Sequence, residues 1–142
     1  MNALDDYENR FIKRNNLKAD DLASMLDIIT EICEISENGY VHFINDSEKR
    51  LSDKERIYTV LSARYLAHNL QVSLNRDVPI SASVEAQELA EMLMMEKNTV
   101  LARVSEYRKK NKVSDVSKGV YEATAQGVKD FLSGLSKEKR RM

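Results

Sequence analysis

Side chains able to hydrogen-bond to nucleic acid bases are spaced along one helical stretch of the chain. Between residues 97 and 110, Val100, Leu101, Val104 and Tyr107 recur at helical spacing, and Asn98, Thr99 and Arg103 are turned outward. An asparagine amide can form two hydrogen bonds with adenine, and an arginine guanidinium can form two with guanine. A threonine hydroxyl can bond to a base or to a phosphate. The stretch therefore predicts a surface that contacts base edges.

Lysines flank these residues on both sides, and we expect their ammonium groups to meet phosphates: Lys97, Lys109, Lys110 and Lys118. The formal net charge of the whole chain is only −1. From residue 97 onward, however, 12 basic and 5 acidic side chains give +7, whereas residues 1–50 carry 11 acidic and 6 basic side chains. The positive charge thus gathers where the base-contacting residues lie. An ordinary solvated surface followed by a basic end is the alternative explanation.

Glu106 is evidence against a nucleic-acid surface, because its carboxylate repels phosphate. The repulsion is avoided if Glu106 accepts from a cytosine amine or pairs with Arg103 or Lys110. The alternative for the whole stretch is an exposed helix face whose charges pair at a spacing of four residues.

The elements that must position this helix follow from local patterns. A short helix precedes the helix at 97–110, and we expect Ser83 to cap its N-terminus. Neither of these two helices can form a core alone. A longer helix over 51–70 opens with the capping box Ser52-Asp53-Lys54-Glu55, and Val78-Pro79-Ile80 is expected to form a short edge strand. A hairpin around Gly119 uses residues 112–116 and 120–123, and Thr124 caps a last helix.

This order of elements resembles the winged helix-turn-helix domain of transcription regulators. The resemblance covers residues 51–135 and is carried by Glu88-Leu89-Ala90, Asn98-Thr99-Val100, Val104, Tyr107 and Lys112-Val113. It implies sequence-preferring binding of double-stranded DNA in transcription regulation. The second helix (97–110) would enter the major groove and the wing (112–124) would touch the backbone. The sequence departs from the pattern at two glycine positions, which hold Met94 and Asn111.

Residues 1–50 are predicted to form an N-terminal helical segment with one short strand. Its helices would cover residues 3–15 and the apolar stripe from Leu22 to Cys33, with Ser36–Gly39 ending the second helix. Residues 40–44 would form the strand and residues 45–50 a polar connector. We expect these acidic helices to support a homodimer and to offer a surface for a protein partner; the alternative is that they pack on the chain's own core. Residues 136–142 are expected to form a flexible basic tail.

Other classes of protein receive little support. His42 and His68 stand in no ligand or triad spacing, Cys33 is the one cysteine, and no glycine-rich phosphate loop occurs. We therefore expect no enzyme activity, catalytic residue, metal or cofactor. No apolar run approaches the roughly 20 residues that span a bilayer, and a lone cysteine suits the reducing cytoplasm.

The sequence predicts a mainly α protein with a small β-hairpin, made of a winged helix-turn-helix domain and an N-terminal helical segment. The alternative function is a winged-helix module that binds protein within a larger assembly, without direct DNA readout.

Overall fold

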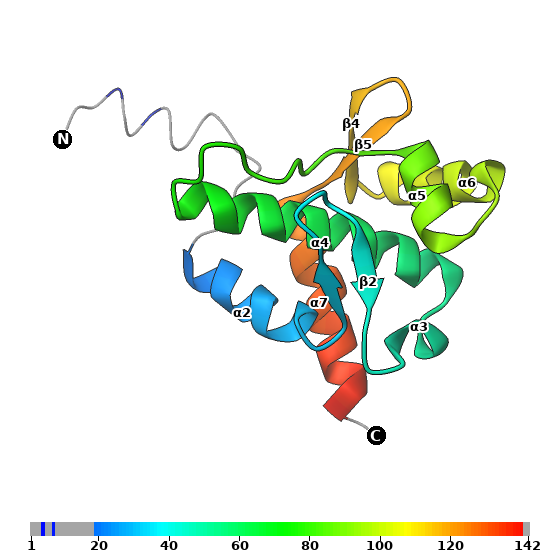
Figure 1. Cartoon of the computed structure of the whole chain (residues 1–142), viewed down its shortest axis with the longest axis horizontal. Helices are drawn as coiled ribbons and strands as arrows, with labels where there is room; N and C mark the ends of the chain where they lie inside the picture. The colour runs from blue at the N-terminus through cyan, green and yellow to red at the C-terminus, as the bar shows by residue number, and fades with distance from the viewer. Residues whose placement is uncertain (1–3, 5–6, 8–18, 141–142) are drawn as a thin grey trace.

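A computed structural model of the chain describes residues 4, 7 and 19–140. It confirms a mainly helical protein with small antiparallel sheets (Figure 1). In chain order the elements are α2 (Ala19–Ile29), β1 (Cys33–Ile35), β2 (Val41–Phe43), α3 (Ser47–Arg50), α4 (Asp53–Ser73), β3 (Val84–Glu85), α5 (Ala86–Leu93), α6 (Lys97–Lys109), β4 (Val113–Ser117), β5 (Val120–Ala123) and α7 (Ala125–Arg140). The helix predicted over residues 3–15 lies outside the described residues except at Leu4 and Tyr7.

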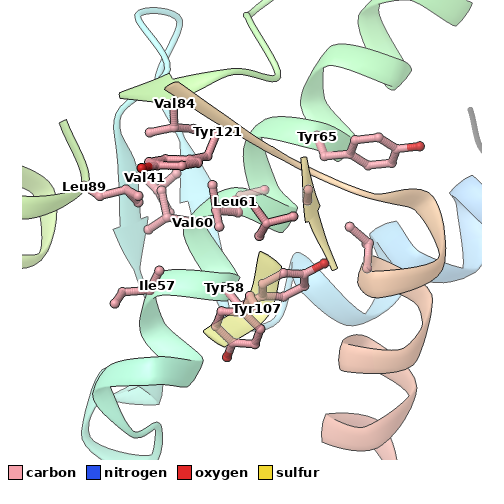
Figure 2. Close-up of a cluster of buried hydrophobic side chains, with 14 of the residues drawn as sticks. Val41, Ile57, Tyr58, Val60, Leu61, Tyr65, Val84, Leu89, Tyr107 and Tyr121 are labelled. Atoms are coloured by element: carbon pink, nitrogen blue, oxygen red, sulfur yellow. The ribbon is translucent and has the colours of Figure 1, made fainter. Parts of the chain in front are cut away.

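Helix α4 is the central element, and its start agrees with the predicted capping box. The Glu55 N–H donates to Ser52 Oγ (3.1 Å), and the Ser52 N–H donates to Glu55 Oε1 (2.9 Å). All side chains from Ile57 to Ala67 are buried, so this helix is covered on every side. Figure 2 shows Val41, Leu89, Tyr107 and Tyr121 reaching the α4 residues from other elements. Helix α4 continues to Ser73, past its predicted end at residue 70.

The three-stranded sheet has the order β3-β5-β4 and is antiparallel throughout. Strands β4 and β5 form the predicted hairpin, and Gly119 takes a positive φ of 75° at its tip. The strand predicted at residues 78–80 was wrong, because the sheet uses Val84–Glu85 instead. Val84 is fully buried, whereas Val78 is 89% exposed. Glu85, and not the predicted Ser83, caps α5 by a capping box with Glu88.

The N-terminal part departs from the prediction between Thr30 and Gly39. Helix α2 ends at Ile29, and Cys33–Ile35 forms a strand that pairs with β2 rather than the end of a helix. The glycine turn closes this hairpin: the Ser36 N–H donates to Tyr40 O (2.9 Å), and the Gly39 N–H donates to Ser36 O (2.8 Å). The strand predicted at 40–44 is confirmed as β2. Residues 47–50 of the predicted connector form the short helix α3, which Ser47 fastens by donating to Ile32 O (2.7 Å).

Residues 19–50 and 51–135 share one hydrophobic core. Leu22, Met25 and Ile29 of α2 are buried with residues of α4 and α7. The apolar stripe of α2 therefore packs within the chain, as the alternative prediction held. Helix α7 continues through Arg140, past the predicted boundary at residue 135. No helix among the described residues is long and apolar enough to cross a membrane.

Candidate nucleic-acid interface

Helices α5 and α6 are joined by a tight turn whose conformation depends on Met94. This residue takes a left-handed conformation (φ 55°, ψ 46°), and 93% of its surface is exposed. It stands where the resemblance to winged-helix domains implies a glycine. A left-handed residue other than glycine costs roughly 1–2 kcal/mol, so the turn is held against a local strain.

Helix α6 presents the two faces that the sequence predicted. Val100, Val104 and Tyr107 are buried, whereas Asn98 and Lys109 are exposed and Thr99 is half-buried. The Tyr107 ring packs on Tyr58, with 4.6 Å between the ring centroids. The buried tyrosine therefore fixes which side of α6 faces solvent.

Lys97 and Lys118 lie on different elements but line the same groove. Its cavity volume is about 560 Å³, and it runs between the start of α5, the start of α6 and the tip of the β4–β5 hairpin. The Ala86 N–H donates to Gly119 O (3.0 Å), which ties the hairpin tip to α5. Glu85, whose side chain takes part in the capping box of α5, also lines the groove. Figure 1 shows this hairpin beside the α5–α6 pair.

Lys109 and Lys110 lie at the opposite end of α6. Both are exposed; Lys109 is the last residue of α6, and Lys110 is its C-cap residue. Asn111 follows with a positive φ of 60°, which confirms the expectation that asparagine replaces glycine in this left-handed position. The predicted cations thus flank the exposed face of α6 at both ends.

Arg103 pairs with Glu106 on the next turn of α6, with 3.1 Å between Nη1 and Oε1. The second carboxylate oxygen of Glu106 lies 3.4 Å from Lys54 Nζ, at the start of α4. Partial desolvation raises the pKa of Glu106, but the hydrogen bond and charge of Lys54, together with Arg103, outweigh it and hold the pKa below its ordinary value. The Arg103 pairing that the sequence allowed for Glu106 is therefore present.

Two cations of this surface were absent from the predicted set. Arg108 pairs with Asp115 of β4 (3.1 Å), and Lys54 pairs with Glu106. Asp115 and Lys54 lie on separate elements from the helix residues they bind, so helical spacing alone gives no signal for either pair.

The other side chains able to do chemistry lie outside α6 and the β4–β5 hairpin: Cys33, His42 and His68. Burial, and to a lesser degree the charge of Glu34, raises the pKa of the Cys33 thiol to about 12, which fits an inert core cysteine. His42 Nε2 lies 3.1 Å from Ser36 Oγ, and His68 Nδ1 lies 2.8 Å from Ile80 O. Within residues 4, 7 and 19–140, no group of three or more His, Cys, Asp or Glu side chains is placed to hold a metal ion.

The surface of α6 and the hairpin therefore offers amide, hydroxyl, guanidinium and ammonium groups on a convex helix beside a projecting loop.

The chain matches no protein-family model, no curated protein and no solved structure.

Proposed function

We propose that this chain binds double-stranded DNA and regulates transcription, without enzyme activity, with α6 in the major groove and the β4–β5 hairpin against the adjacent backbone. The order α4, β3, α5, α6, β4, β5 and the sheet order β3-β5-β4 support this, because they resemble a winged helix-turn-helix domain. Such a domain reads bases from the first turns of its second helix, where Asn98 and Thr99 stand. The buried cysteine suits a cytoplasmic protein.

The observation that carries the proposal is the convergence of Lys97 and Lys118 on one groove. With α6 in the major groove, the phosphate backbone that borders the groove would meet both ammonium groups, one from the helix and one from the wing. Phosphate contacts of this kind position a protein on the duplex, while the side chains between them reach the bases. Lys109 and Lys110 would meet the backbone at the other end of α6.

Fluorescence anisotropy with mixed-sequence duplex DNA across a salt series tests the proposal. We expect affinity to fall steeply with salt, and the double variant Lys97→Gln, Lys118→Gln to reduce the slope of log K against log salt by about 2. Lys129→Gln is the matched control, because Lys129 lies on α7 and pairs with Asp21 (3.3 Å). A loss of slope of about 1 in the control, the same for each lysine removed, would assign the effect to overall charge.

A protein-binding module is the second candidate, and the exposed apolar side chains near the same surface favour it. Met94 is 93% exposed in the α5–α6 turn, and Val116 is 52% exposed on the hairpin. Where such side chains gather into one patch, they commonly mark a contact with another protein. Absence of duplex binding even at low salt would favour this candidate over DNA readout.

We also propose that the DNA-bound form is a homodimer, because two-fold symmetry lets a regulator contact two half-sites. The stripe of α2 is occupied within the chain, so the dimer contact would use another surface. Light scattering of the complex with a selected duplex tests this: one copy of the 16.3 kDa chain per duplex would contradict it.

A further inference from the structure

Arg103, Glu106 and Lys54 form a continuous set of contacts from the exposed side of α6 to the start of α4. Glu106 uses one carboxylate oxygen for Arg103 Nη1 (3.1 Å) and the other for Lys54 Nζ (3.4 Å). The carboxylate is thereby held between two cations that lie on different helices. An isolated pair on one helix surface would leave both side chains free to change rotamer.

Lys54 is itself held by the buried side chain of Tyr107. Its Nζ lies 5.1 Å from the centroid of the Tyr107 ring, and its backbone carbonyl accepts a hydrogen bond from the Tyr107 hydroxyl (2.9 Å). Only 6% of Tyr107 is exposed, and the capping box at Ser52 fixes the turn of α4 that carries Lys54. The packed Tyr107 thus holds Lys54, Lys54 holds Glu106, and Glu106 holds Arg103.

The hydrogen bond to Glu106 engages only the Nη1 group of Arg103, and no hydrogen bond joins its Nη2 or Nε to the described residues. The guanidinium has five N–H donors in a rigid plane, so these nitrogens keep a free edge. Guanine presents two acceptors, O6 and N7, to such an edge in the major groove. A phosphate oxygen would accept equally well from a mobile arginine, so orientation decides between the two targets.

We propose that Glu106 is a positioning residue that makes Arg103 a reader of guanine, and that Lys54 holds Glu106 in place for this role. The inference rests on the proposed DNA-binding function and names the base that one position of the target would carry. Glu106 also repels phosphate, so it discourages Arg103 from settling on the backbone. Its carboxylate therefore weakens non-specific binding while it favours one base.

The proposal predicts opposite effects on two kinds of binding when the carboxylate is removed. Wild-type protein is first used to select duplexes from a random-sequence library, and each guanine of the selected site is then changed. We expect one guanine position at which wild-type affinity falls about tenfold or more on substitution, in line with a two-bond arginine contact. Glu106→Gln should lose most of that discrimination and bind mixed-sequence duplex more tightly than wild type.

Further variants test whether a loss of guanine discrimination comes from the position of Arg103, from a change in net charge or from unfolding. Lys54→Met, which keeps the apolar stem, should lose part of the same guanine discrimination. Glu91→Gln is the control, because it removes an exposed carboxylate from α5 that hydrogen-bonds only to Gln87 in the described structure. It should raise affinity for all duplexes alike and keep the guanine preference. Thermal melting of each variant checks that it is folded.

The outcomes distinguish this inference from the proposed function on which it rests. A wild-type protein that binds no duplex at low salt would overturn both. A wild-type protein that binds duplex DNA but shows no guanine position sensitive to Arg103→Ala would overturn the inference alone. Retention of full guanine discrimination in folded Glu106→Gln would overturn it as well.

Discussion

Gly39 occupies a backbone position that other residues take only under strain. Its φ is +89°, and a Cβ added there would lie 2.9 Å from the Arg64 guanidinium carbon. Arg64 is only 5% exposed and cannot move freely, because it donates to Gly39 O (3.2 Å), Ser81 O (2.7 Å), Ser83 O (2.9 Å) and Glu88 Oε2 (3.1 Å). This one side chain connects the N-terminal hairpin to the loop before β3 and to α5.

We therefore expect Gly39→Ala to lower the free energy of unfolding by about 1–3 kcal/mol, from the strained φ and the displaced guanidinium. Urea denaturation measures the change. Gly134→Ala is the matched control: Gly134 is exposed within α7, and an added Cβ would meet no atom within 4 Å. Alanine there should stabilise by about 0.5–1 kcal/mol. Equal effects of the two substitutions would show that Arg64 and the backbone conformation at Gly39 do not matter.

Local chemistry explains which single residues the sequence could predict. The capping box at Ser52 and Glu55, the positive φ of Asn111 and the turn at Gly119 each depend on neighbours within a few positions. The contacts of Arg64 join residues 17 to 25 positions apart. No local pattern indicates such partners, because only the assembled fold brings them together.

At the scale of elements, the β4–β5 hairpin is tied to α6 by an ion pair that bridges the two. Arg108 in the last turn of α6 lies 3.1 Å from Asp115 of β4, next to the irregular register between Asp115 and Ser117. Both side chains are about half exposed, so the pair contributes at most about 1 kcal/mol. Its position suggests a role in setting the angle of the hairpin rather than in stabilising the core.

If the pair positions the hairpin for the proposed DNA contact, Asp115→Ala should weaken duplex binding about threefold, although it removes a negative charge from the surface that we propose to contact phosphates. Arg108→Ala should weaken binding by at least as much, and the charge exchange Arg108→Asp with Asp115→Arg should restore part of the loss. Anisotropy titrations at one salt concentration measure all three. Tighter binding by Asp115→Ala would indicate that simple repulsion, and not wing geometry, governs this site.

Element type was predictable where one pattern stood alone and failed where two patterns overlapped. Helix α4 combines a clear capping box with an interior free of glycine and proline, and the β4–β5 hairpin has the turn signal of Gly119. Ile29, Ile32 and Cys33 fit a helical stripe, whereas Cys33-Glu34-Ile35 also fits an alternating strand. Glycine at position 39 ends a helix as readily as it closes a hairpin. The pairing of Cys33 with Phe43, a tertiary contact, decides for the strand. Likewise Val84 becomes a strand because β5 offers it a partner.

At the scale of the whole molecule, the N-terminal segment is a layer of the same core rather than an appendage. Leu22, Met25 and Ile29 of α2 lie against α4 and α7, and Cys33 and Val41 of the β1–β2 hairpin also lie against α4. The boundary that the sequence suggested at residue 50 follows the start of the stretch that resembles a winged helix-turn-helix domain. The order of local elements does not say which apolar faces meet, so the shared core could not be predicted from it.

A fragment that starts at residue 51 should therefore fail to fold cooperatively. Removing residues 1–50 would expose the side of α4 that α2 and the β1–β2 hairpin cover, and it would leave the Arg64 guanidinium without its contact to Gly39 O. Among the described residues of that layer, five buried apolar side chains would be lost, namely Leu22, Met25, Ile29, Cys33 and Val41. At roughly 1.5–3 kcal/mol for each of the four larger ones, the loss is about 6–12 kcal/mol, comparable to the 5–15 kcal/mol that holds a typical domain folded. Circular dichroism during heating should show a sharp transition for the full chain and a broad one for the fragment, which should also bind a hydrophobic dye. A sharp transition and salt-dependent duplex binding by the fragment would show instead that residues 51–142 are an independent domain, and that residues 1–50 serve another purpose.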